Sequence, residues 1–158
     1  MKDVSIRVAK SDEARFIVQM IRHMVEDMAR YGGHAVATDD AAWEKILESL
    51  TTELRGPTTK YVIAERSNGD QIGVAGAELL MLRGAFLPKN TLHISVLYVF
   101  PEFRGCGVGG KLLTTLLDWG RDEGIEECGL NVLSKNPAKS LYERLGFSTI
   151  ELKMARPL

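Results

Sequence analysis

The sequence lacks several features that would assign it to a particular class of protein. No stretch approaches the roughly 20 apolar residues of a membrane-spanning helix, and the first ten residues, MKDVSIRVAK, lack the apolar core of a secretory signal. The formal net charge is −1, so there is no basic surplus that would favour nucleic acid or an anionic membrane surface. We therefore expect no nucleic-acid partner, no membrane partner and a cytoplasmic location.

Cysteine is also scarce. Cys106 and Cys128 do not have the spacing of a metal site, so we expect two free thiols and no bound metal. A chain of 158 residues with 45% hydrophobic and 26% charged residues is typical of one soluble domain with a sizeable core. No repeat, linker or low-complexity tract divides it, and we expect a single domain over residues 1–158.

The most informative stretch is residues 92–111, LHISVLYVFPEFRGCGVGGK. Its first nine residues are rich in β-branched and aromatic side chains, which predicts a buried strand, and Pro101 ends that strand because proline has no N–H to donate. Four glycines follow, and leucines at helical spacing predict a helix over residues 111–121. A strand, a glycine-rich turn and a helix N-terminus form an anion site, because unpaired N–H groups and the positive end of the helix dipole meet there.

Two common phosphate-binding motifs fit this stretch only in part. Gly105, Gly107 and Gly110 satisfy the dinucleotide pattern G-x-G-x-x-G, but no acidic residue stands about 20 residues later, where the chain reads LNV. Residues 105–111 also spell G-x-x-x-x-G-K, but Leu112 stands where a P-loop needs Ser or Thr for magnesium. We therefore expect neither dinucleotide binding nor magnesium-dependent binding of ATP.

Hydrophobic periodicity and turn signals predict the remaining elements. The expected helices cover residues 12–30 and 40–54, and a further helix is capped by Asn136 and ends at Gly146. The expected strands, besides the one over 92–100, are 4–8, 60–65, 72–82, 126–133 and 147–155, with Gly73 and Gly76 marking a bulge or a close backbone approach. The order β-α-α-β-β-β-α-β-α-β indicates an α/β fold with one mixed central β-sheet flanked by helices.

Two motifs in the second half resemble the GNAT family of N-acetyltransferases. Residues 104–109, RGCGVG, match the pattern (Arg/Gln)-x-x-Gly-x-(Gly/Ala), and residues 136–147, NPAKSLYERLGF, match the family's second motif through Tyr142, Gly146 and Phe147. The two motifs stand in the family's order and at its usual separation. The resemblance covers residues 92–147 and implies the GNAT-like fold, with acetyl-CoA as co-substrate and no metal.

The resemblance also implies a set of site residues. The amides of the glycine turn would bind the diphosphate, and the pantetheine arm would lie between the central strand and the strand ending at Leu133. Arg104 could pair with a phosphate or, alternatively, with a surface carboxylate. The implied coenzyme-binding residues are Leu97, Tyr98, Val99, Arg104, Gly105, Cys106, Gly107, Val108, Gly109, Gly110 and Asn136.

The implied catalytic residues follow from the same comparison. Tyr142 stands where the family often has the general acid that protonates the departing thiolate. His93 is a candidate general base, since an imidazole with a pKa of about 6.5 suits proton transfer at neutral pH. Glu78 competes for that role, and Ser95, two residues from His93 on the same strand, is a candidate to position a water molecule.

The function implied is transfer of an acetyl group to a primary amine by direct attack in a ternary complex. The acceptor would be a small-molecule amine or a peptide amine, and its identity is left open. A non-catalytic acyl-CoA-binding or sensing domain is the alternative. The resemblance also allows a homodimer without requiring one.

Overall fold

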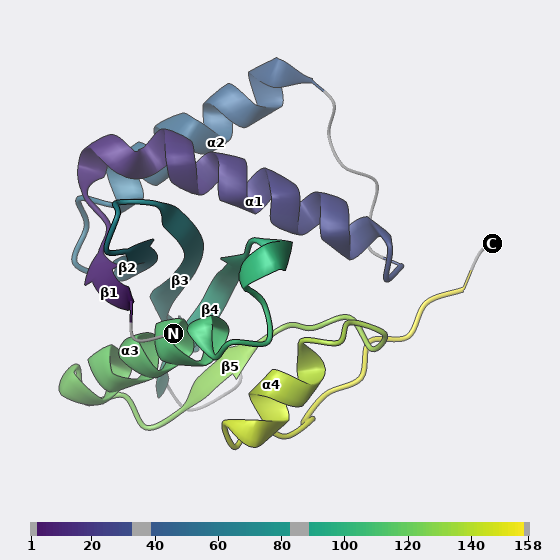
Figure 1. The fold of residues 1–158 in the computed structure, drawn as a ribbon. Coiled ribbons are helices and arrows are strands. Elements are labelled where there is room, and N and C mark those ends of the chain that lie inside the picture. The colour runs from purple at the N-terminus through teal and green to yellow at the C-terminus, as the bar shows by residue number, and fades with distance from the viewer. Residues whose placement is uncertain (1–2, 33–38, 83–88, 157–158) are drawn as a thin grey trace.

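A five-stranded sheet runs through the centre of the computed structural model, which describes residues 3–32, 39–82 and 89–156 (Figure 1). The strand order is β1-β2-β3-β4-β5; neighbouring strands among the first four are antiparallel, whereas β5 is parallel to β4. The strands are β1 (Val4–Val8), β2 (Thr59–Arg66), β3 (Gln71–Leu82), β4 (Lys89–Val99) and β5 (Cys128–Leu130). The sheet is therefore mixed, as the sequence predicts.

Helices cover both faces of this sheet. Helices α1 and α2 lie against one face, whereas α3 and α4 lie on the opposite side (Figure 1). The helices are α1 (Ala14–Ala29), α2 (Asp40–Glu53), α3 (Val108–Asp122) and α4 (Lys139–Arg144), with short 3-10 turns η1 (Ser11–Glu13) and η2 (Pro101–Phe103). None of the helices in the described residues combines the length and apolarity needed to cross a membrane.

The alternation of side chains along β2 divides the core into two layers. Val62 and Ala64 pack with Leu112 and Leu116 of α3, whereas Tyr61 and Ile63 pack with Ile17 and Met20 of α1. Residues that alternate along a strand point to opposite faces, so a strand buried on both faces is apolar at every position. This explains why β2 contains the continuous apolar run Tyr61–Ala64.

The predicted order of elements is confirmed through the last helix, but the final strand is wrong. Residues 147–156 pair with no strand, and Ile150, Leu152 and Met154 are 89%, 80% and 92% exposed. Their alternation satisfies the local pattern of a strand, yet strand formation also requires a hydrogen-bonding partner, which no local pattern supplies. Strand β5 is shorter than the predicted 126–133, because its pairing with β4 stops at Leu130.

A β-bulge lies in β4 at Ser95. Gly76 of β3 faces Val96 and Ala77 faces Ile94, so Ser95 is the extra residue between them. The bulge changes the alternation: Ile94 and Leu97 pack in the α3 layer, whereas Val96 and Tyr98 pack in the α1 layer. The sequence left a bulge or a close approach open at Gly73 and Gly76; beside Gly76 the structure shows a bulge whose extra residue belongs to the neighbouring strand.

Gly76 is required here by the ring of Tyr61, its partner on β2. A Cβ atom at position 76 would lie 2.3 Å from Cε1 of Tyr61, far inside van der Waals contact. We expect Gly76→Ala to lower the free energy of unfolding by about 3 kcal/mol in urea denaturation, since the buried ring has little room to move. Gly129→Ala, where a Cβ meets nothing within 4 Å, should change it by less than about 1 kcal/mol. Equal effects of the two substitutions would show that the Tyr61 ring moves aside freely.

Candidate active site

The glycine loop, defined as residues 104–110, connects the end of β4 to the start of α3. Strand β4 ends at Val99, and the 3-10 turn η2 begins with Pro101 and carries the chain to Arg104. Gly105 and Gly107 then adopt φ values of 74° and 83°, which other residues adopt only with strain. A Cβ at either position would meet nothing within 4 Å, so the space beside both glycines is open.

The loop presents a run of unpaired backbone amides. The first amide after the loop that donates a backbone hydrogen bond is that of Lys111, which donates to the carbonyl of Gly107 at 3.1 Å. Within the described part of the chain, none of the six amides of residues 105–110 donates to a backbone or side-chain acceptor. Six consecutive free N–H groups at the N-terminus of a 15-residue helix are suited to hold a diphosphate. The chain therefore fits the anionic part of coenzyme A at this turn.

The buried first residues of α3 support the glycine loop, and α4 packs against the first turn of α3. Val108, the first residue of α3, is buried with Leu112 and Leu113. A Cβ built on Gly109 would lie 3.2 Å from Cδ2 of Leu141 in α4. The two sequence motifs are thus brought into contact, with the second motif supporting the first.

Arg104 directs its guanidinium to the α1 side of the sheet. Its Nη2 donates to Oδ2 of Asp27 at 2.7 Å, and its Nε donates to the carbonyl of Val99 at 2.8 Å. The guanidinium carbon also lies 5.1 Å from the centre of the Tyr98 ring. Of the two partners that the sequence left open for Arg104, the structure shows the carboxylate. A contact with coenzyme remains a prediction for this residue.

Strands β4 and β5 part where the pantetheine arm is expected. Their parallel pairing covers Leu92 with Cys128, His93 with Gly129, and Ile94 with Leu130, and it ends there. Beyond Ile94, β4 continues to Val99 paired only with β3. Residues Leu97–Val99 therefore border the opening between the two strands, which is the position expected for coenzyme-binding residues.

Asn136 acts as a local cap. Its Oδ1 accepts a hydrogen bond from the amide of Ala138 at 2.9 Å, and its carbonyl accepts one from Lys139 at 3.1 Å. Helix α4 begins at Lys139 with Ala138 as its N-cap, two residues later than predicted. Asn136 therefore caps the turn that leads into α4 and not the helix itself, and its contact with coenzyme remains a prediction.

Tyr142 lies on α4 and packs partly buried against the α3 layer of the core. Its ring meets that of Phe147 edge to face, with centres 6.1 Å apart. Burial raises the pKa of the Tyr142 phenol, so the hydroxyl stays protonated at neutral pH. Among the described residues, no hydrogen-bond partner is present for this hydroxyl, which leaves it able to donate to a ligand.

His93 and Glu78 are direct neighbours across β4 and β3. They form one cross-strand pair, and Thr59 of β2 stands beside Glu78 in the same row. Because Leu92 and Ile94 pack in the α3 layer, His93 and Glu78 point to the opposite face, the one covered by α1 and α2. In the described part of the chain neither side chain has an ion-pair partner. The sequence proposed them as competing bases; the structure places them side by side.

Tyr61 belongs to the same region and was not predicted. Its side chain is 5% exposed. Burial raises the pKa of Tyr61 to about 12, with Glu53 adding to the rise, a hydrogen bond with Ser95 opposing it and Glu78 adding to it. The Tyr61 hydroxyl therefore lies near residues of α2, of β3 and of the bulge in β4. In the sequence Tyr61 is only one apolar position of a strand, and no signal distinguishes it.

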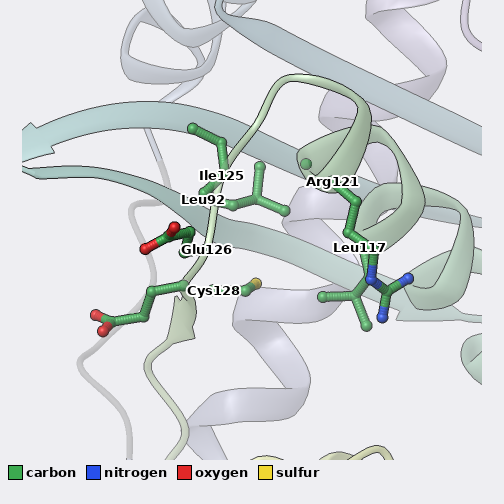
Figure 2. Close-up of a pocket in the computed structure, with 8 residues that line it drawn as sticks. Leu92, Leu117, Arg121, Ile125, Glu126 and Cys128 are labelled. Carbon is green, nitrogen blue, oxygen red and sulfur yellow. The ribbon is translucent and has the colours of Figure 1, made fainter.

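A separate cavity of about 170 Å³ lies at the other end of α3 from the glycine loop (Figure 2). It is lined by Leu92, Leu117, Ile125 and Cys128, together with Arg121 and the chain leading into β5. Burial raises the pKa of the Cys128 thiol to about 11, so this sulfur stays protonated. None of the predicted site residues lines this cavity. Among the described residues, no group of three or more His, Cys, Asp or Glu side chains is placed to hold a metal ion.

The fold is an α/β sandwich in which a turn of free amides at a helix N-terminus follows a strand whose parallel pairing ends after three residues, an arrangement suited to a phosphorylated ligand. A family model described as the acetyltransferase (GNAT) family matches residues 18–147. The chain therefore belongs to the GNAT family, and it is an acetyl-CoA-dependent N-acetyltransferase.

Individual relatives agree with this assignment. The chain is 26% identical to thialysine N-epsilon-acetyltransferase of Bos taurus over 92% of this chain and 85% of that protein. A shorter match, 33% identical, covers 35% of this chain and 38% of the [ribosomal protein bS18]-alanine N-acetyltransferase of Haemophilus influenzae. The fold is similar to that of a predicted acetyltransferase from Clostridium acetobutylicum solved with acetyl-CoA, with a TM-score of 0.78, 17% identity and 98% and 96% of the two chains covered.

The free amides of the glycine loop lead to a prediction for Gly107. In Gly107→Ala the methyl group would strain a residue with φ of 83° and occupy the open side of the turn, so the dissociation constant for coenzyme A should rise at least about tenfold. Gly124→Ala is the matched control, because Gly124 has a similar φ of 74° and equal free space at the far end of α3. Isothermal titration calorimetry would measure both. An equal loss of affinity in the two variants would show that general destabilisation, and not the loop, controls binding.

Proposed function

We propose that the protein acetylates a primary amine by direct attack on the thioester in a ternary complex, with Tyr142 as the proton donor. The observation that carries this proposal is the set of six free amides in residues 105–110, beside the opening between β4 and β5. When bound there, acetyl-CoA would supply the activated acetyl group. The residues around the opening then have to hold the amine, take its proton and return a proton to the thiolate.

Tyr142 is suited to the last of these tasks. It lies on α4, whose Leu141 lies close to Gly109 in the first turn of α3, and its ring packs in the same α3 layer of the core. Burial raises the pKa of the Tyr142 phenol, so the hydroxyl is protonated at neutral pH and can donate a hydrogen bond, or its proton, to the departing thiolate. Its free hydroxyl would deliver that proton without first breaking a hydrogen bond within the protein.

His93 and Glu78 support removal of the proton from the amine. As cross-strand neighbours on the face opposite α3, they place an imidazole and a carboxylate beside each other. Glu53 and Glu78 also lie close enough to Tyr61 to affect its pKa, so two carboxylates approach this region from α2 and β3. Such a region attracts a cationic amine and accepts its proton. The bovine relative, which acts on the ε-amine of thialysine, supports a lysine-like or other small amine as acceptor.

Direct attack is favoured over an acetyl-cysteine intermediate by the state of the two thiols. Cys106 is exposed within the glycine loop itself. The pKa of Cys128, raised to about 11, leaves almost no thiolate at neutral pH, and its sulfur borders the cavity at the far end of α3. Neither cysteine is therefore suited to carry the acetyl group between two half-reactions.

The expected activity can be measured as release of free thiol from acetyl-CoA in the presence of a panel of small amines, lysine analogues and peptides. With the best acceptor, Tyr142→Phe should lower kcat about a hundredfold, because general acid catalysis is typically worth that much. The dissociation constant for coenzyme A should stay unchanged. Tyr31→Phe, which removes a phenol hydroxyl at the end of α1, should leave kcat within about twofold of the wild type.

Two other results would contradict this mechanism. Full activity in Tyr142→Phe would exclude the phenol as the proton donor. Binding of coenzyme A without turnover of any amine would favour a non-catalytic acyl-CoA-binding or sensing domain. His93→Ala and Glu78→Gln, tested in the same assay, would identify the general base. The base is the residue whose substitution lowers kcat and leaves the affinity for coenzyme A unchanged.

We further propose that the protein forms a homodimer through residues 150–154. Ile150, Leu152 and Met154 alternate with polar residues in an extended tail, and all three are at least 80% exposed. The three-residue β5 is the edge strand of the sheet. A second copy's tail is the natural partner for such an edge, because it supplies both backbone hydrogen bonds and an apolar face.

The dimer can be tested by light scattering after gel filtration. The wild-type protein should have twice the mass of the chain at micromolar concentration. Leu152→Lys should convert it to a monomer, because a charge on the apolar side of the tail cannot be buried without a partner. Glu151→Lys, one residue away on the polar side, should remain dimeric. A monomeric wild type, or a dimer that tolerates Leu152→Lys, would overturn the proposal.

A further inference from the structure

Asp27 lies outside both family motifs, yet it contacts the residue from which the glycine loop starts. It stands in the last turns of α1, where its Oδ2 accepts from Nη2 of Arg104 at 2.7 Å and its Oδ1 lies 3.3 Å from Nη1 of Arg30. The Asp27 side chain is 19% exposed, and that of Arg104 is 43% exposed. Among the described residues, these two make the only ion pair between α1 and the glycine loop.

Arg104 is held from three directions at once. Asp27 binds one end of the guanidinium, the carbonyl of Val99 binds its Nε at 2.8 Å, and the ring of Tyr98 lies beneath it at 5.1 Å. The backbone of Arg104 is fixed as well, since its amide donates to the carbonyl of Pro101 at 3.2 Å. The residue before the positive-φ Gly105 therefore has a defined orientation in both backbone and side chain.

The same part of α1 packs on the end of β4. One turn before Asp27, the ring of His23 stacks on that of Tyr98 with centres 5.9 Å apart, and Phe100 meets both rings edge to face. The ion pair and the aromatic contacts together fix α1 to the segment that leads from β4 into the loop. Helices α1 and α3 lie on opposite faces of the sheet (Figure 1). Arg104, which precedes α3 and binds Asp27 of α1, therefore links the two layers at the end of β4.

We propose that Asp27 is a positioning residue for the coenzyme: by holding Arg104, it orders the start of the glycine loop before the diphosphate binds. This inference rests on the proposed function, in which the amides of residues 105–110 bind that diphosphate. An ordered loop pays less conformational entropy on binding than a mobile one, so the ion pair contributes to affinity without touching the ligand. Its consequence is that the guanidinium of Arg104 is engaged with α1 and not with the phosphates.

The test compares coenzyme binding and catalysis in variants of the whole chain. Asp27→Asn should raise the dissociation constant and the KM for acetyl-CoA about fivefold, the size expected for a partly exposed ion pair. Both kcat and the KM for the amine should stay within about twofold of the wild type. Asp27→Glu, which keeps the charge, should restore most of the affinity. Asp118→Asn, which breaks an exposed ion pair with Arg121 elsewhere on α3, should have no effect on the coenzyme.

A double substitution tests whether Asp27 acts through Arg104. If it does, Asp27→Asn combined with Arg104→Gln should bind coenzyme no more weakly than Arg104→Gln alone. Additive losses would show independent roles and overturn the proposal. So would tighter binding in Asp27→Asn, which would mean that Asp27 merely competes with the phosphates for Arg104.

A lower melting temperature of Asp27→Asn with unchanged affinity for coenzyme A would show a purely structural ion pair. Failure of the wild type to bind coenzyme A would instead refute the proposed function itself.

Discussion

The loss of a hydrogen-bonding partner along one side of β4 is the constraint on which the site depends. Up to Ile94 the strand is paired on both sides, and from there to Val99 it is paired with β3 alone. Backbone groups left without partners carry a cost unless water or a ligand satisfies them. The edge of β4 beyond Ile94 is therefore a place where an extended, amide-bearing molecule can supply the missing backbone hydrogen bonds. The short β5, the bulge at Ser95 and the turn after Pro101 all lie within a few residues of that edge.

The loop that follows extends the same principle from a strand to a helix. Among the described residues, the amides of residues 105–110 find no acceptor, because the local backbone conformation does not direct them toward one. Positive φ values at Gly105 and Gly107 set the direction of the peptide groups in the turn. The first N–H groups of α3, which begins at Val108, have no intrahelical acceptors. Burial of Val108 and Leu112 fixes the helix against the sheet, so the amides keep a defined position. Anion binding thus depends on apolar packing beneath the loop as much as on the glycines within it.

The parts of this arrangement that the sequence predicts are those governed by local chemistry. Pro101, the glycine run and the leucine spacing of α3 each leave a signal within a few residues, and the loop they predict is confirmed. What the sequence cannot show depends on residues far apart. The partner of Arg104 is 77 positions away, and the proximity of Tyr61 to Ser95 depends on the register of three strands. The strand expected over residues 147–155 is wrong for the same reason, since its alternation is local and its partner is not.

The placement of the candidate bases shows how the two layers divide the chemistry. Tyr142 belongs to the α3 layer, on the side of the glycine loop and the second motif. His93 and Glu78 face the α1 layer, and Tyr61 packs within it. A reaction that takes a proton from an incoming amine and gives one to a leaving thiolate uses two separate proton-handling groups, one near the amine nitrogen and one near the sulfur. A strand with an open edge between two helical layers provides that separation, and the bulge at Ser95 is where the alternation of β4 changes from one layer to the other. Under the proposed mechanism the amine would meet His93 and Glu78 on the face of the sheet that α1 and α2 cover, while the thioester sulfur would lie toward Tyr142 in the α3 layer.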